Sequence, residues 1–142
     1  MNSETPELML LEELSRLREY IDGFEELIEE AKLLSASKEL EKAVLEDFVE
    51  KLGESLKAIE GAVLAFARVS ANEQVVGRSK HYAVLINYLN VIALPFMAML
   101  LDKIEARTTE DQLRQRLSRC KMELERLHQQ ASSHSKISST SP

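Results

Sequence analysis

Residues 81–100, HYAVLINYLNVIALPFMAML, are almost entirely apolar and decide how the rest of the chain is arranged. Between Tyr82 and Leu101 only Asn87 and Asn90 have fully polar side chains. About 20 such residues are enough to span a bilayer. The same stretch also suits a helix buried on all sides by other helices of one bundle, or a helix whose exposed apolar face binds a partner. The segments around it separate these interpretations.

The first segment predicts a long amphipathic helix over about 6–34. Thr5 and Pro6 form a helix start, because the side chain of Thr caps the helix and Pro presets φ. The apolar residues that follow recur at alternating spacings of four and three, which is typical of one buried helix face. They are Leu10, Leu14, Leu17, Ile21, Phe24, Ile28 and Ala31.

A second helix of similar length is predicted over about 38–70. Ser37 is placed to cap it, and its apolar residues follow the same spacing of three and four. The short joint implies an antiparallel hairpin with the first helix. Gly53 and Gly61 weaken this helix relative to Ala, and either leaves space for close approach of a neighbour.

The apolar stretch lies in a third predicted helix over about 80–107, in which Pro95 interrupts one backbone hydrogen bond and produces a kink. A fourth helix is predicted over about 110–131, capped by Thr108 or Thr109. Residues 132–142 are rich in Ser and are predicted to form a disordered tail, since they bury too little apolar surface to offset their ordering entropy. Residues 1–131 then form a single domain.

These elements predict an all-α fold, an antiparallel four-helix bundle with the apolar helix in its interior. The whole chain contains only four Gly and three Pro, which argues against an all-β fold with many turns. Residues 1–34 carry ten acidic and three basic residues, whereas residues 108–142 carry four acidic and six basic ones. We therefore expect the first and last helices to be antiparallel neighbours that pair their charges.

A membrane-anchored coiled-coil protein with a single span at about 82–101 is the alternative. Two Asn amides and Pro95 oppose insertion, since an unpaired amide in hydrocarbon costs several kcal/mol. Positively charged residues flank the stretch on both sides, so its orientation would be poorly specified. The net charge of −6 speaks against binding to nucleic acid. The segment that begins at Met1 lacks the pattern of a signal peptide, which together with a single Cys favours the cytoplasm.

No catalytic constellation, cofactor motif or metal site is predicted, and we expect the chain not to be an enzyme. Glu125 and His128 have the Glu-x-x-His spacing of di-iron bundles, but the second copy that such a site needs is missing. Cys120 lies among the apolar residues of the last helix, so it is predicted to be a small buried hydrophobe, with an intersubunit disulfide as the alternative.

The sequence thus favours a non-enzymatic module for protein–protein interaction: an adaptor, a regulator or an assembly subunit. Its amphipathic helices could also be satisfied between chains, which makes self-association, for example as a dimer, the other expectation. The last helix is the shortest and the narrowest in its apolar stripe, so it should detach most readily. The predicted partner-contact residues are Leu113, Leu117, Leu124 and Leu127.

Overall fold

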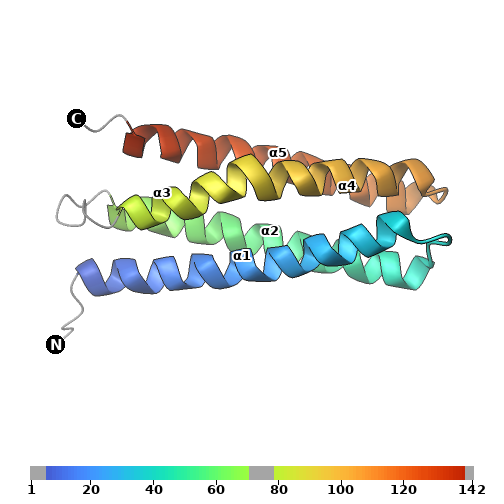
Figure 1. Cartoon of the computed structure of the whole chain (residues 1–142), viewed down its shortest axis with the longest axis horizontal. Helices are drawn as coiled ribbons and strands as arrows, with labels where there is room; N and C mark the ends of the chain where they lie inside the picture. Colours follow the sequence, from blue (N-terminus) through green and yellow to red (C-terminus); the bar gives the residue numbers. More distant parts are fainter. Residues whose placement is uncertain (1–5, 71–78, 140–142) are drawn as a thin grey trace.

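The structure, a computed structural model, describes residues 6–70 and 79–139, and the regular elements in these ranges are all helical (Figure 1). In chain order they are α1 (Pro6–Ala36), α2 (Lys42–Ser70), α3 (Ser79–Tyr88), the π-helical segment η2 (Leu89–Ala93), α4 (Leu94–Arg107) and α5 (Asp111–Ser139). Because α3, η2 and α4 follow one another without a break, they form one continuous helix, called here the third helix. The predicted all-α four-helix bundle is confirmed.

The bundle consists of two antiparallel hairpins, α1 with α2 and the third helix with α5 (Figure 1). Between the hairpins, α1 packs against α4 and α2 packs against α5, so these neighbours run parallel. Helices α1 and α5 therefore lie at opposite corners. The expectation that the first and last helices are neighbours is wrong, because the apolar stripes, and not the net charges of the segments, determine which helices pack together.

The charged residues of α5 and of the turn before it instead form ion pairs with its two real neighbours, α2 and α4. The Arg126 guanidinium lies 3.0 Å from the Glu60 carboxylate of α2, and the Glu110 carboxylate, which directly precedes α5, lies 3.0 Å from the Lys42 ammonium group of α2. The Lys121 ammonium group lies 2.7 Å from the Asp102 carboxylate of α4. Exposed pairs of this kind contribute roughly 0–1 kcal/mol each, so they follow the packing and do not direct it.

The core is made by one apolar face of each helix, as the spacing of three and four predicts. From Leu14 to Ala31 in α1, the predicted residues whose side chains the structure describes are all buried. The largest buried side chains in the bundle include Phe24 of α1, Phe48 of α2 and Met97 of α4. Aliphatic residues supply most of the remaining volume, which fits a chain without Trp.

The predicted caps Ser37 and Thr108 are wrong, and for the same reason, while the alternative cap Thr109 stays a prediction. Ser37 does not cap α2, which begins only at Lys42; its hydroxyl donates instead to the Leu33 carbonyl at the end of α1, at 2.7 Å. The Thr108 hydroxyl likewise donates to the Ile104 carbonyl of α4 at 2.7 Å, and α5 begins at Asp111. A Ser or Thr hydroxyl just after a helix can satisfy a carbonyl behind it as readily as an N–H group ahead of it.

Arg107, the last residue of the neighbouring helix α4, holds the end of α1 and the turn that follows it. Its guanidinium donates hydrogen bonds to four carbonyls, those of Leu34, Ser35, Ser37 and Lys38. Because α1 and α4 run parallel, their negative C-terminal ends lie at the same end of the bundle. A guanidinium placed there satisfies carbonyls that have no partner within the helix and offsets the repulsion between the two ends.

The irregularity predicted at Pro95 takes the form of the π-helical segment η2 just before it. The Leu94 N–H donates to the Leu89 carbonyl, a bond one residue longer than in an α-helix. In a regular α-helix the ring of Pro95 would collide with the Val91 carbonyl, and the wider turn avoids this contact. The predicted α-helical run over 80–107 is therefore correct in extent, with one π-helical turn inside it.

The ends of the helices agree with the sequence to different degrees. Helix α1 begins at Pro6 as predicted, while its predicted cap Thr5 lies outside the described residues. Helix α5 continues to Ser139, beyond the predicted end at Ala131. Residues 140–142, at the end of the predicted tail, and residues 71–78, most of the predicted loop, also lie outside the described residues.

Candidate functional site

The third helix lies at a corner of the bundle and not in its interior, so one of its faces meets solvent (Figure 1). This corrects the expectation of a helix buried on all sides: α1 and α5 cover two flanks, and α2 lies diagonally across. Four apolar side chains on the uncovered face form what we call the apolar ridge. They are Val84, Val91, Ile92 and Met99, with 68%, 64%, 52% and 45% of their surface exposed.

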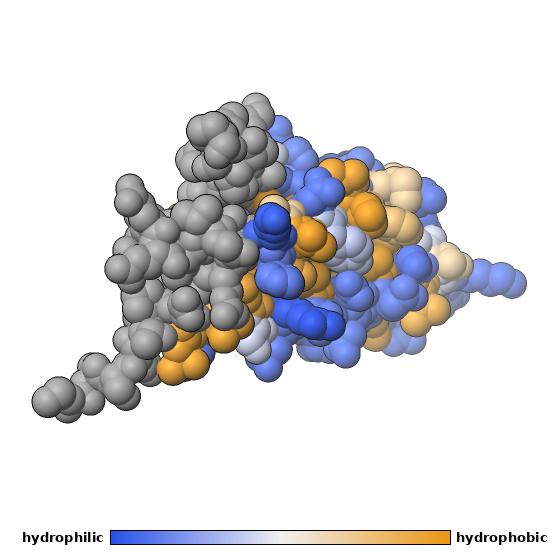
Figure 2. All heavy atoms as spheres, turned by 60° about the vertical axis from the view of Figure 1, so that its left-hand side comes forward, coloured by the Kyte–Doolittle hydropathy of each residue, from blue (hydrophilic) through white to orange (hydrophobic). Residues whose placement is uncertain are grey.

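The helix over Lys80–Arg107 is also long and apolar enough to cross a membrane. It has 28 residues, and its most apolar window of 18 residues has a mean hydropathy of 2.0. Within this window 44% of the residues are buried inside the bundle. The apolar composition thus serves two surfaces, the core and the ridge. Figure 2 shows hydrophobic side chains reaching the surface between hydrophilic ones.

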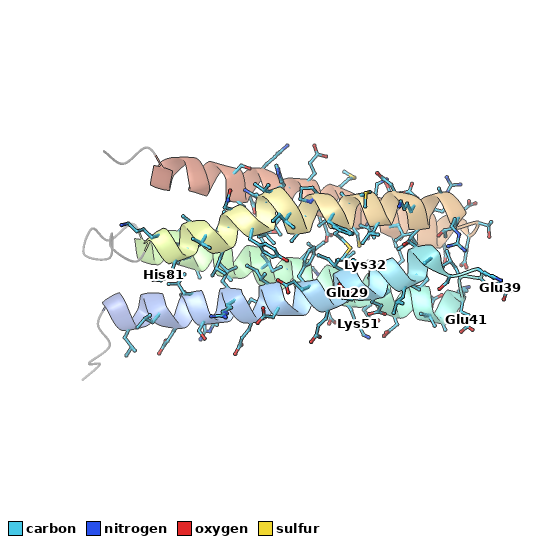
Figure 3. The ribbon with its side chains drawn as sticks, viewed as in Figure 1. Glu29, Lys32, Glu39, Glu41, Lys51 and His81 are labelled. Carbon is cyan, nitrogen blue, oxygen red and sulfur yellow. The ribbon has the colours of Figure 1, made fainter. Side chains whose placement is uncertain are left out.

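A groove of about 770 Å³ runs beside the ridge between α1 and α3, and we call it the α1/α3 groove. It forms because α1 packs more extensively against α4 than against α3. Apolar side chains from both helices line it: Leu11, Leu14, Ile21, Val84, Leu85 and Tyr88. The polar lining residues are Ser15, Arg18, Asp22, Glu25 and His81, and Figure 3 shows His81 at the start of α3, on the side of α1.

The charge of this groove comes mainly from α1. Helix α1 carries nine acidic and three basic residues, so it accounts for the whole net charge of −6, and the rest of the chain is balanced. Inside the groove, burial raises the pKa of the Tyr88 hydroxyl, and its hydrogen bond to Glu25 and the nearby Asp22 carboxylate raise it further. An anionic phenolate is disfavoured here because the surroundings are already negative.

A second, smaller groove of about 310 Å³ lies on the other flank of the ridge, between α4 and α5. Pro95 and Ala98 of α4 line it together with Glu125 and His128 of α5, the pair whose spacing resembled half of a di-iron site. Lys121 binds two carboxylates of α4 at its edge, and both hydrogen bonds raise the pKa of its ammonium group. Among the described residues, no group of three His, Cys, Asp or Glu side chains is placed to hold a metal ion.

The four predicted contact leucines lie in the core, between α5 and its neighbours α2 and α4. Leu113, Leu117, Leu124 and Leu127 are each at most 4% exposed. A partner would reach them only after α5 had separated from the bundle. Cys120 is buried beside them, as predicted, and burial raises the pKa of its thiol from 9.0 to about 11.

An exposed apolar face on the third helix was one of the alternatives from sequence, but the ridge residues were not predicted, although a signal for them was present. The buried residues of the third helix already account for its core face: Tyr82, Ile86, Leu89, Asn90, Ala93, Leu94, Met97, Leu100, Leu101 and Ile104. Val84, Val91 and Met99 lie off this stripe, and an apolar residue that the core stripe does not use is a candidate for an exposed position.

Comparison with family models, curated proteins and solved structures found no match to this chain. The apolar ridge and the two grooves beside it therefore carry the functional argument alone.

Proposed function

We propose that this chain is a non-enzymatic interaction module, an adaptor, a regulator or an assembly subunit in the cytoplasm, that binds another protein through the exposed face of its third helix. The apolar ridge is the observation that supports the proposal. Its four side chains extend over about 22 Å, at 1.5 Å per residue, so they offer several turns of helix to a partner. Grooves on both flanks provide the concave surface in which a partner's side chains fit.

Folding leaves part of the apolar area of the third helix in contact with solvent. Full burial of a Val, Ile or Met side chain contributes about 1.5–3 kcal/mol, and the ridge residues keep roughly half of that area in solvent. Covering all four would therefore contribute a few kcal/mol before the cost of association is subtracted. Such a surface suits a reversible complex of moderate affinity, with another protein or with a second copy of the chain.

The ridge is tested with Val91→Gln combined with Ile92→Gln. Gln keeps the helix propensity and removes the apolar surface, so the fold should persist while binding is lost. Leu64→Gln combined with Val44→Gln is the matched control, since both positions are exposed on α2. Quantitative affinity purification and light scattering compare the two variants at equal helicity. Loss of the same partners, or of the same dimer, in both variants would contradict a role for the ridge.

A single membrane span at about 82–101 is the second candidate function, supported by the hydropathy of this helix. It requires the bundle to open so that the third helix can leave its neighbours. Fractionation without detergent separates the two candidates, because the interaction module should stay in the high-speed supernatant. Recovery in the membrane pellet, with the flanks of the span protected differently from protease by vesicles, would favour the span.

A further inference from the structure

We infer that the α1/α3 groove receives a basic amphipathic helix of another protein, about four turns long. This inference rests on the proposed function and adds to it the position and the chemistry of the partner. The shape and the charge of the groove support this partner, and the same charge disfavours other occupants.

The shape of the groove matches a helix. On α1 its lining runs from Leu11 to Glu25, which at 1.5 Å per residue corresponds to about 21 Å. Beyond this end α1 closes onto α4, where the Lys32 ammonium group lies 5.2 Å from the centre of the Phe96 ring. A docked helix would thus place apolar side chains, spaced by three and four residues, against the apolar lining and stop near Phe96.

The charge of the groove selects a basic partner. Asp22 and Glu25 line its inner part, and they belong to the helix that carries the whole net charge of the chain. Arg18, at the middle of the α1 lining and one turn before Asp22, also lines the groove, as does His81 at the start of α3, so the two carboxylates exceed the guanidinium by one negative charge. Lys or Arg side chains of the partner would therefore be placed next to Asp22 and Glu25, and the field of α1 would speed their approach.

The same charge disfavours two other occupants. A second copy that placed its own α1 face here would bring two acidic helices together, and an anionic lipid surface would be repelled in the same way. Self-association through this groove and adsorption to lipid therefore become outcomes of the test.

The test uses the full chain and a synthetic helical peptide of about 15 residues, made of Leu and Lys with Leu at spacings of three and four. A second peptide with Glu in place of Lys is the probe of opposite charge. We expect the Lys peptide to bind, with changes in the NMR signals of the Val84 methyl groups, and the Glu peptide to bind at least about tenfold more weakly at low salt. Equal binding of both peptides would overturn the charge argument.

A pair of adjacent residues supplies the matched charge control. Glu25 lines the α1/α3 groove, whereas Glu26 lines a different groove, between α1 and α2. Glu25→Lys and Glu26→Lys change the net charge equally, so a difference between them reports the position of the charge. Only Glu25→Lys should strongly weaken binding of the Lys peptide, by at least about fivefold. An equal effect of both variants would show a general attraction to α1 and overturn the inference.

A pair of valines separates the inference from the proposed function. Val84 lines the groove and Val91 does not, although both lie on the ridge and are similarly exposed. Loss of peptide binding in Val84→Gln, but not in Val91→Gln, supports the groove. If Val91→Gln alone abolishes binding, the groove is wrong but the interaction function stands. A dimer detected by light scattering and lost in Glu25→Lys, or binding to vesicles with phosphatidylserine, would replace the inferred partner.

Discussion

The thiol of Cys120 lies between α5 and its neighbours, and its environment makes it inert. It is 5% exposed, and burial raises its pKa from 9.0 to about 11, so almost none of it is thiolate at neutral pH. We predict that Ellman's reagent reacts with it at pH 8 only as fast as the protein unfolds. Rapid labelling of the native protein would show that α5 opens locally and exposes the thiol.

The raised pKa of Cys120 also predicts how stability depends on pH. Between about pH 9 and pH 11 the unfolded chain has lost the thiol proton while the folded chain retains it. The folded state then binds more protons, so the free energy of unfolding decreases as pH rises through this window. Urea titrations at pH 8, 9 and 10 should show a smaller decrease for Cys120→Ala than for the natural chain. A decrease of equal size would assign the effect to other groups.

Asn90 is the other residue whose environment makes a definite prediction. It is 8% exposed; its amide nitrogen donates to the Ser132 hydroxyl at 3.1 Å, and its side-chain oxygen has no hydrogen-bond partner among the described residues. Ser132→Ala should lower the free energy of unfolding by about 1–2 kcal/mol, because the buried amide then loses its acceptor. Asn90→Leu removes both polar atoms and should be neutral or stabilising. Equal destabilisation by both changes, measured by urea unfolding, would contradict this account.

At the scale of the element, α2 contains glycines that the fold does not need. A Cβ atom added to Gly53 or Gly61 would meet no atom of another residue within 4 Å, so the expected close approach of a neighbour is wrong for both. Gly61→Ala should therefore raise the free energy of unfolding by about 0.5–1 kcal/mol through helix propensity. Ala58→Gly, one turn away, should lower it by a similar amount. Thermal unfolding checks both, and a destabilising Gly61→Ala would reveal a contact outside this bundle.

Arg107 links two elements, and its effect on stability should exceed that of an ordinary exposed cation. Arg107→Ala leaves two carbonyls at the end of α1 and two in the α1–α2 turn without this donor, which should lower the free energy of unfolding by about 1–2 kcal/mol. Arg107→Lys keeps the charge but has fewer donors in a fixed fork, so it should restore only part of the loss. Lys103→Ala, at an exposed position one turn earlier, is the control and should change stability little.

The third helix shows how far an element can be predicted from sequence. One row of its buried residues from Tyr82 to Ile104 follows spacings of 4, 3, 4, 4, 3 and 4, with two fours in succession from Leu89 to Met97, and the buried Asn90, Leu94 and Leu101 lie beside this row. Eight residues advance an ideal helix by about 80° past two whole turns, so the face would drift away from the core. The π-helical turn at η2 takes up the extra residue. Because Asn90, Leu94, Met97, Leu101 and Ile104 also form a buried row with ordinary spacings of 4, 3, 4 and 3, the pattern did not single out η2, and the irregularity was predicted from Pro95.

At the scale of the whole molecule, the sequence was sufficient for the number of helices and for their buried faces. It was not sufficient for their arrangement, because every apolar stripe could pack against any other. The predictions of Ser37 and Thr108 as helix caps were wrong for a related reason: each hydroxyl could bond either to an N–H group ahead of it or to a carbonyl behind it. The pattern places Val84 and Val91 off the core stripe, but it could not show that they are exposed, since their burial depends on which helices lie beside the third one.

The arrangement of the bundle bears directly on the role predicted for α5. Leu117 and Leu124 are 0% and 2% exposed, so replacement of either by Ala should lower the free energy of unfolding by about 2–5 kcal/mol. A domain of this size has about 5–15 kcal/mol in total, so the double variant should lose helicity and partner capture together. Met122→Ala, on the exposed side of α5 at 69% exposure, should change neither. If the double variant kept its circular dichroism but lost capture, α5 would be a detachable contact helix, and the buried leucines would bind the partner after the bundle had opened.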